Sequence, residues 1–277
     1  MNERSDAYGA MLLAALEGRD AIEIVERDDG FIDASVLGPG LYLAPYRRWP
    51  AHHRRGIRFA RGRVLDVGCG GGRVALHLEE RGHEVVSIDS SPGAIEVCRR
   101  RGVLDARLLS IDDVDDSLGR FDTIVMLGNN LGLLANERKG KRLLHRFHRL
   151  TSERGRIVAE SRDVHRTDDP AHLAYHERNR RRARLDGQIR VRVRFRERAT
   201  PWFDYLMLSP AELAGLLAST GWVVGRILPS EDTYVAVIEK EGQARASRSA
   251  EGGSSSSATS APSGRRPRRG GRASSRS

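Results

Sequence analysis

Cysteines and long apolar runs are scarce in this chain. Its 277 residues include only two cysteines, too few for a disulfide framework, so we expect a reducing compartment. No stretch approaches the roughly 20 apolar residues that a membrane-spanning helix needs. The first residues also lack the positively charged start and the small-residue cleavage site of a signal peptide. We therefore predict a cytoplasmic protein without a membrane partner.

Acidic residues are too few to balance the basic ones, and the formal net charge is +10. Residues 241–277 hold eight arginines and two glutamates, which leaves +4 for the first 240 residues. This terminal segment is rich in Ser, Gly, Ala, Pro and Arg and has little apolar surface to bury, so we predict a disordered basic tail over residues 242–277. The rest of the chain has an ordinary charge for a soluble enzyme.

Between residues 62 and 241, short apolar segments alternate with helical patterns. The pattern predicts helices at 73–81, 92–101 and 137–150, and strands at 63–67, 84–89, 106–111, 121–127 and 156–160. Strands separated by helices indicate a parallel sheet with helices on both faces. Two further strands, at 222–228 and 234–239, follow a helix that Ser209 caps. Upstream, a short helix at 6–16 precedes a stretch at 30–61 that we interpret as irregular.

Residues 164–208 interrupt this alternation after the fifth strand. A helix is predicted at 169–184, and strict alternation of apolar residues with arginine at 188–198 predicts a half-buried strand with a solvated basic face. Residues 202–208 suit its antiparallel partner. We expect this insertion to form a substrate-binding element, in which Trp202, Phe203 and Tyr205 line an apolar pocket. The alternative is that these three side chains belong to the core of the insertion.

The strongest motif is Val64–Arg73, with the sequence VLDVGCGGGR. A buried strand runs into a turn with four glycines between positions 68 and 72, and a helix follows. Glycine is needed where the backbone approaches a ligand closely or takes a positive φ. The turn lies at the carboxyl end of the first strand, where open α/β sheets bind ligands. A dinucleotide site would place a third glycine where Arg73 stands, so the motif disfavours that cofactor.

Strand, Asp-x-Gly-x-Gly-x-Gly and helix together resemble motif I of the class I S-adenosylmethionine-dependent methyltransferases. The resemblance implies a Rossmann-like doubly wound fold and S-adenosylmethionine as the cofactor. It further implies that Asp66 bonds toward the amino end of the cofactor, where a carboxylate suits an ammonium group. The turn residues that it assigns to the cofactor are Gly68, Cys69, Gly70 and Gly72.

Polar residues follow the next three strands. Asp89, with Ser90 beside it, can accept hydrogen bonds from the hydroxyls of a ribose; its alternative role is to cap the following helix. In the resembling family, a side chain at the position of Asp112 or Asp113 lies near the adenine amino group, and the position of Asn129 lies beside the sulfonium and the acceptor. The alternatives are a solvated loop for Asp112 and an Asn-rich turn for Asn129.

The domain boundaries follow from these patterns. Residues 1–61 form an N-terminal helix and a segment that covers the cofactor, in which Tyr42, Tyr46 and Trp49 are candidates to face a sulfonium cation. Folding of this segment onto the core is the alternative. Residues 62–241 form the methyltransferase domain, with the insertion at 164–208, and residues 242–277 form the tail.

Methyl transfer from a sulfonium is a direct displacement, so the protein mainly has to align the acceptor with the methyl carbon. A general base helps when the acceptor loses a proton, and the candidates are His165, His172 and Glu160. We expect no metal site. A small molecule is the favoured acceptor. The alternatives are a methyltransferase that modifies RNA or DNA through its arginines, and a protein that binds S-adenosylmethionine without turnover.

Overall fold

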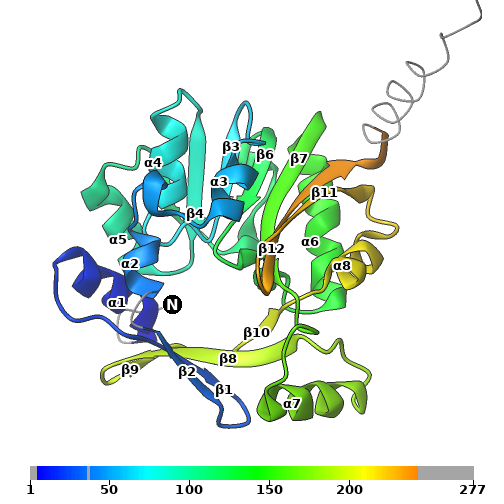
Figure 1. Ribbon diagram of the computed structural model, residues 1–277. Coiled ribbons are helices and arrows are strands. Elements are labelled where there is room, and N and C mark those ends of the chain that lie inside the picture. The colour runs from blue at the N-terminus through cyan, green and yellow to red at the C-terminus, as the bar shows by residue number, and fades with distance from the viewer. Residues whose placement is uncertain (1–4, 36–37, 243–277) are drawn as a thin grey trace, which may run out of the picture.

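A seven-stranded sheet forms the centre of the protein (Figure 1). The computed structural model describes residues 5–35 and 38–242. The strand order is β11-β12-β7-β6-β3-β4-β5; the five strands from β7 to β5 are parallel, and β12 and β11 are antiparallel. This confirms the predicted Rossmann-like sheet. The strands are β3 (Val64–Val67), β4 (Val85–Asp89), β5 (Ala106–Leu108), β6 (Phe121–Met126), β7 (Thr151–Arg162), β11 (Trp222–Pro229) and β12 (Thr233–Lys240).

Helices cover both faces of this sheet because successive strand residues point to opposite sides. On one face, Leu65 packs with α6 and α8, whose buried residues include Leu143, Phe147 and Leu216. On the other face, Val64 packs with α3, α4 and α5. These helices are α3 (Ala51–Ile57), α4 (Arg73–Glu79), α5 (Pro92–Arg101), α6 (Glu137–Leu150) and α8 (Pro210–Leu217). The Ser209 cap of α8 was predicted, and it forms a capping box with Glu212.

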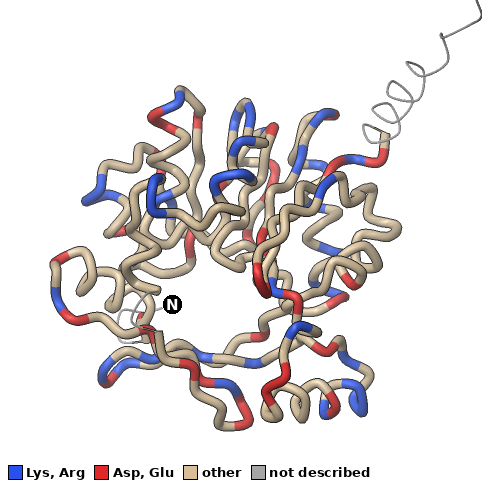
Figure 2. Tube along the Cα trace, viewed as in Figure 1, with Lys and Arg blue, Asp and Glu red and all other residues tan. Residues whose placement is uncertain are grey.

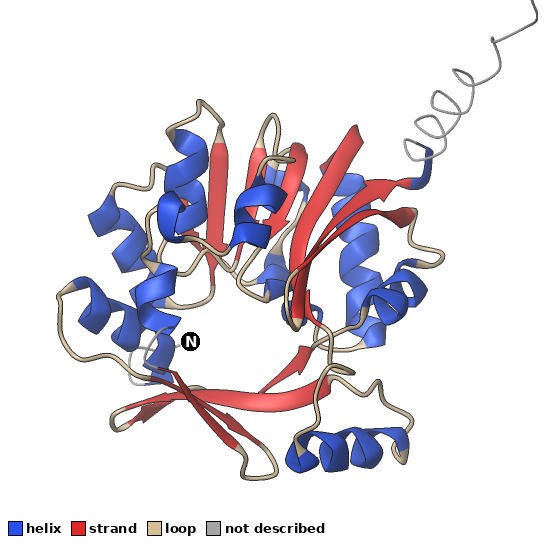
Figure 3. Ribbon diagram, in the orientation of Figure 1, coloured by secondary structure: helices blue, strands red, loops and turns tan. Residues whose placement is uncertain are grey.

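A second, smaller sheet lies across from the carboxyl ends of the parallel strands (Figure 3). Its order is β10-β8-β1-β2, with β9 pairing to β8, and every pair is antiparallel. The pairing of β10 with β8 confirms the predicted antiparallel insertion. Its strands are β1 (Glu23–Arg27), β2 (Ile32–Ser35), β8 (Gln188–Phe195), β9 (Arg198–Ala199) and β10 (Phe203–Leu206).

The N-terminal segment is more regular than predicted. The stretch at 30–61 contains β2, α3, the short helix α2 (Gly38–Tyr42) and a 3-10 turn, and β1 precedes it. The prediction of an irregular stretch is wrong. Within this stretch, β2 pairs with β1, and β1 in turn pairs with β8, which lies about 160 residues later in the chain. Such long-range pairing leaves little local signal.

Other differences are small. The third strand ends at Leu108, before a 3-10 turn at Ile111–Asp113, and the fifth strand extends over Thr151–Arg162. Helices α1 (Ala7–Leu16) and α7 (Pro170–Arg180) lie within their predicted ranges. None of the described helices combines the length and apolarity needed to cross a membrane. The predicted disordered tail lies, from residue 243 on, outside the described residues, and the domain boundaries remain predictions.

Candidate functional site

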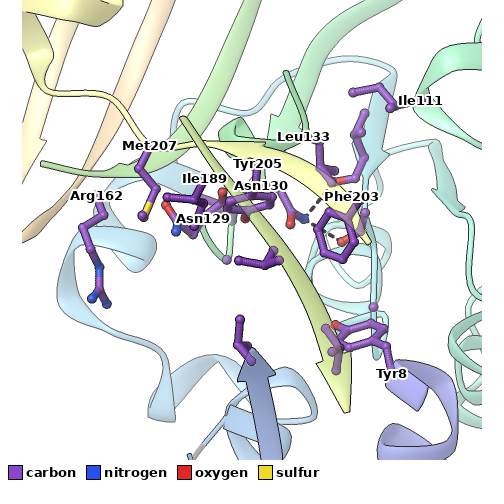
Figure 4. A pocket seen from close by; sticks show the side chains of 18 of the residues that line it. Tyr8, Ile111, Asn129, Asn130, Leu133, Arg162, Ile189, Phe203, Tyr205 and Met207 are labelled. Carbon is purple, nitrogen blue, oxygen red and sulfur yellow. Dashed lines mark hydrogen bonds between the residues drawn. The ribbon is translucent and has the colours of Figure 1, made fainter. Parts of the chain in front are cut away.

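A cavity of about 840 Å³ lies between the two sheets. One wall is formed by the carboxyl ends of β3, β4 and β6. The opposite wall is the inner face of the second sheet, where alternate residues of each strand point inward (Figure 4). The apolar residues of that wall are Val25, Ile189, Val191, Val193, Phe203 and Met207. The cavity therefore joins the glycine-rich turn to an apolar surface from a different part of the chain.

The glycine-rich turn forms its wall with backbone atoms. Gly68 and Gly70 have φ angles of +69° and +52°, which favour glycine. A Cβ on Gly70 would lie 2.7 Å from the hydroxyl oxygen of Tyr8. The Asn130 amide donates hydrogen bonds to the carbonyl oxygens of Val67 and Gly68, at 3.0 and 2.7 Å (Figure 4). Glycine at position 70 thus leaves room for Tyr8, and Asn130 fixes the conformation of the turn.

Asp66 ends β3 beside this turn and is 2% exposed. Its Oδ2 has no hydrogen-bond partner within the described residues. Burial raises the pKa of Asp66 to about 7, although the nearby Arg73 opposes the increase. A buried carboxylate oxygen without a donor suits a ligand that brings a positive charge.

Asp89 ends β4, and its two carboxylate oxygens accept hydrogen bonds from the glycine-rich turn and from the start of α5. Its Oδ2 accepts from the Gly70 amide at 3.0 Å and its Oδ1 from the Ser91 amide at 2.9 Å. Burial raises the pKa of Asp89 to about 6, against these backbone hydrogen bonds. The Ser91 side chain, and not Asp89, caps α5. Each carboxylate oxygen can accept a further hydrogen bond, which suits two neighbouring hydroxyls.

The cavity brings together most of the residues that the sequence assigned to the cofactor. Those that line it are Asp66, Gly68, Cys69, Gly70, Asp89, Ser90, Asp112 and Asn129. Gly72 does not line it: it precedes α4, and a Cβ there would lie 2.7 Å from a methyl carbon of Val103. Gly72 thus has a packing role, and its assignment to the cofactor stays a prediction. The Asp112 carboxylate accepts from the Lys139 ammonium at 2.7 Å.

Glu160 lies outside the lining of the cavity, and its role as a general base stays a prediction that this position does not favour. Its Oε1 lies 2.9 and 2.7 Å from the Nε2 atoms of His52 and His53. Its Oε2 accepts from the amides of Gly128 and Asn129, both at 2.7 Å. Burial opposes ionisation, but these hydrogen bonds outweigh it and hold the pKa of Glu160 well below its usual range. Glu160 instead holds the Asn129 loop in place.

His52, His53 and Glu160 form a buried cluster that sequence reasoning missed. Their potential ligand atoms lie within 4.8 Å of one another, close enough to hold a metal ion. Contacts within the protein hold these side chains together without a metal ion. Nδ1 of His53 accepts from the Arg73 guanidinium at 3.0 Å, and its Nε2 lies 2.7 Å from Oε1 of Glu160. Burial lowers the pKa of His53. The expectation of no metal site stays a prediction.

Two further candidates lie away from the cavity. His165 faces Asp186 and Glu212, at 3.8 and 3.4 Å, and does not reach the cavity wall. Trp202 lies outside the lining, with the Arg192 guanidinium 4.7 Å from its ring centroid. The prediction that Trp202 lines the pocket is wrong because the residues that flank it in sequence, and not its own indole, face inward.

Phe203, Tyr205 and His172 do line the cavity. The Tyr205 hydroxyl donates to the carbonyl oxygen of Asn129, which links β10 to the loop after β6 (Figure 4). Nδ1 of His172 lies 3.0 Å from the Thr167 hydroxyl oxygen. The second sheet is therefore tied to the first beside the glycine-rich turn.

Glu23 is a cavity residue that sequence reasoning missed. It accepts hydrogen bonds of 3.0 and 3.1 Å from the Tyr42 hydroxyl, and burial raises its pKa, with Asp33 adding to the increase. Tyr42 lines the cavity, whereas Tyr46 and Trp49 do not. Alternation along β1, which turns residues 23, 25 and 27 to one side, is the signal that could have found Glu23.

Arginines on the outer face of β8 are paired with acids. Arg192 and Arg194 both contact Glu26, at 2.8 and 3.3 Å, and Arg190 lies 3.7 Å from Asp204. Figure 2 shows both acidic and basic segments in the region of the second sheet and α7. The burial of β8 confirms the predicted half-buried strand. This outer face does not present an unbroken basic surface.

Comparisons with known proteins identify the same region. A family model described as a methyltransferase domain matches residues 64–155. A glycine/sarcosine N-methyltransferase of Parasynechococcus marenigrum is 30% identical over 109 residues, which are 37% of this chain and 39% of that protein. A ubiquinone biosynthesis O-methyltransferase of Xanthomonas oryzae pv. oryzae is 35% identical over 77 residues, 26% of this chain and 32% of that protein. The chain thus covers well under half the length of these two relatives.

A solved structure matches over a larger part of the chain. A SAM-dependent methyltransferase of Bacteroides fragilis, in complex with S-adenosyl-L-homocysteine, has a TM-score of 0.73 and 25% identity. The match covers 87% of this chain and 97% of that one. The CcbJ methyltransferase of Streptomyces caelestis has a TM-score of 0.51 at 16% identity, over 72% of this chain and 98% of that one, and it shows the fold alone.

Proposed function

The chain belongs to the class I S-adenosylmethionine-dependent methyltransferases, and on that premise we propose that it methylates a small molecule held between its two sheets. The family and the cofactor predicted from the sequence are thereby confirmed. The observation that carries the proposal is the cavity itself, which joins the motif I turn to the apolar inner face of the second sheet. Ligand sites with an apolar lining and a few convergent polar groups are typical of small-molecule enzymes.

The residues of the first wall suit the adenosyl cofactor. Asp66 offers a buried carboxylate oxygen without a donor, which fits an ammonium group. Gly68 and Gly70 expose backbone to the ligand. Asp89 offers acceptors for two ribose hydroxyls, and Asp112 lies further along the same wall. We therefore assign the methionine end to the Asp66 side of the cavity and the adenosine end to the Asp89 side.

The second wall suits the acceptor. Its valine, isoleucine, phenylalanine and methionine side chains offer an apolar surface for the body of a small molecule. S-adenosylmethionine supplies a methyl group that its sulfonium already activates, so the chain has to align the acceptor and exclude water. Tyr205 and Asn129 bring the two walls together at this point.

Glu23 is the residue that we propose as the acceptor of a proton from the methylated group. It lies on the acceptor wall, burial raises its pKa, and its hydrogen-bond donor is the Tyr42 hydroxyl. A carboxylate with a raised pKa takes up a proton more readily at neutral pH than an ordinary one. Glu23 thus replaces Glu160 and His165 among the candidates, beside His172.

Two measurements test the proposed function. Calorimetry with S-adenosylhomocysteine and with NAD should give binding of the first and none of the second. Methyl-labelled S-adenosylmethionine, incubated with the protein and a fractionated cell extract, should place label in the small-molecule fraction. Label in RNA, DNA or protein would contradict the proposed acceptor class. Binding without label in any fraction would favour a protein that keeps the fold without turnover.

A further inference from the structure

Arg73 is a buried arginine at the cavity wall to which neither motif I nor the proposed reaction gives a role. It is the first residue of α4, follows the glycine-rich turn directly and is 8% exposed. Arginine is almost never buried in a protein unless it is paired. Its presence there therefore calls for a partner.

The partners within the protein satisfy only part of the guanidinium. Its Nη2 donates to Nδ1 of His53 at 3.0 Å, and the group lies 5.0 Å from the ring centroid of Trp49. Its Nη1 is buried and has no hydrogen-bond partner, and Arg73 forms no salt bridge, among residues 5–35 and 38–242. Burial lowers the pKa of Arg73, but an arginine side chain remains protonated in proteins. A buried positive charge thus keeps an unused donor.

No neighbouring carboxylate takes up that donor. The charge of Glu160 favours the protonated form of Arg73, but the two groups form no hydrogen bond within the described residues, and both oxygens of Glu160 already face other donors. The positive charge of Arg73 lowers the pKa of Asp66, against the larger effect of burial. The two groups nevertheless form no ion pair within the described residues. Two opposite charges with unused hydrogen-bonding atoms therefore face the same cavity.

We infer, building on the proposed function, that Arg73 binds the carboxylate of the cofactor's methionine end while Asp66 binds its ammonium group. An α-amino acid group carries both charges on one carbon, and this arrangement of the two side chains complements it. The guanidinium presents N–H donors in a fixed fork that matches a carboxylate. Arg73 would then discriminate adenosyl compounds that carry an amino-acid end from those that lack a carboxylate.

The test varies the ligand before it varies the protein. Calorimetry compares S-adenosylhomocysteine with its decarboxylated analogue, S-adenosyl-3-thiopropylamine, and with 5′-methylthioadenosine, which lacks the whole amino-acid end. We expect the wild-type protein to bind S-adenosylhomocysteine about 10- to 100-fold more tightly than the decarboxylated analogue, the range of a hydrogen bond to a charged group. Equal affinities would overturn the assignment without any variant.

The variants locate the effect at Arg73. Arg73→Met should weaken the binding of S-adenosylhomocysteine by about the same factor and leave the affinity for the decarboxylated analogue unchanged. The effects of the substitution and of removing the ligand carboxylate would then not be additive. Arg73→Lys should retain part of the preference because it keeps the charge without the fork. Arg81→Met is the control, since the Arg81 guanidinium contacts His77 and Tyr46 outside the cavity.

Each outcome has a distinct meaning. If Arg73→Met bound all three ligands more weakly, Arg73 would have a structural role. That result would overturn this inference but leave the proposed function intact. Retention of the carboxylate preference in that variant would do the same. Failure of the wild-type protein to bind any of the three ligands would instead contradict the proposed function from which the inference starts.

Discussion

The carboxylate of Asp66 is buried without a partner among the described residues, and this has a consequence for stability. Its pKa is about 7 in the folded chain and close to 4 in an unfolded one. Between these values the folded state binds more protons, so the free energy of unfolding contributed by Asp66 falls as the pH rises from about 4 to 7. A cationic ligand group beside the carboxylate removes that penalty.

Asp66→Asn should therefore raise the melting temperature of the ligand-free protein above pH 7 and flatten its decline with pH. The same variant should bind S-adenosylhomocysteine at least roughly 10-fold more weakly, because it loses a charge-assisted hydrogen bond. Thermal denaturation from pH 5 to 8.5, with and without this ligand, checks both effects. Asp20→Asn, at an exposed position, is the control. Unchanged affinity in Asp66→Asn would contradict our assignment of the methionine end.

The raised pKa of Glu23 leads us to predict how the reaction rate depends on pH. Because burial raises its pKa, the rate of methyl transfer should rise with pH as this carboxyl loses its proton, and should level off above its pKa. Glu23→Gln should reduce the rate about 100-fold or more, abolish that rise and leave the affinity for S-adenosylhomocysteine within about 2-fold of wild type.

The matched control is Glu26→Gln, on the same strand but paired with arginines on the outer face. Rates are measured with labelled S-adenosylmethionine and the active extract fraction. A wild-type pH profile in Glu23→Gln would eliminate Glu23 as the proton acceptor.

Among the residues of the site, the sequence predicts those that stand at the end of a predicted strand. Asp66, Gly70 and Asp89 stand at the ends of strands, and the cavity collects them as expected. Glu23 and Arg73 could not be found in this way, because a carboxylate on a short strand and an arginine after a glycine turn are ordinary in sequence. Their burial depends on packing against segments more than 15 residues away.

Helix α1 closes one side of the cavity; its apolar residues pack against α5, and the Asp6 side chain adds hydrogen bonds to that packing. The Asp6 carboxylate caps α1 by accepting from the Gly9 amide at 2.9 Å, and it accepts from the Ser91 hydroxyl and the Gly93 amide at 2.8 Å. Tyr8 stands on the same helix against the glycine-rich turn. The docking of α1 and the shape of the cavity are thus coupled.

Asp6→Ala should speed amide hydrogen exchange in α1 and weaken S-adenosylhomocysteine binding by about 5- to 50-fold, because buried donors lose their acceptor. The seven-stranded sheet should keep its protection. Hydrogen exchange with mass spectrometry and calorimetry provide the two readouts, with Asp20→Ala at an exposed position as the control. Exchange that accelerates equally in α1 and in β3 would mean that Asp6 stabilises the whole fold and not this docking.

Elements were predictable where the pattern is local. Helix α6 has leucine and phenylalanine at helical spacing and was predicted over its full length, and β8 followed from its strict alternation. The hairpin of β1 and β2 was missed because three of the four β2 residues are exposed and β1 depends on β8 for pairing. Strands of that kind gain their stability from a distant partner.

For the molecule as a whole, the terminal sequence segment contributes much of the net charge. Residues 241–277 carry eight arginines and two glutamates, while the described residues that line the cavity all precede residue 233. Deletion of residues 243–277 should leave the affinity for S-adenosylhomocysteine within about 2-fold of wild type, because the groups that we assign to the cofactor lie outside this segment. Calorimetry at 150 mM salt checks this, and loss of binding would show that our boundary for the domain is misplaced.

The second sheet also has a consequence for the order in which the protein is made. β1 ends at Arg27 and β8 begins at Gln188, so a ribosome releases the first strand of this sheet long before its partner exists. Until then β1 and β2 form an isolated hairpin, which is marginally stable in water. The cavity between the sheets is therefore completed only after β8 and β10 have been synthesised, and a nascent chain that carries all of motif I still lacks the wall that we assign to the acceptor.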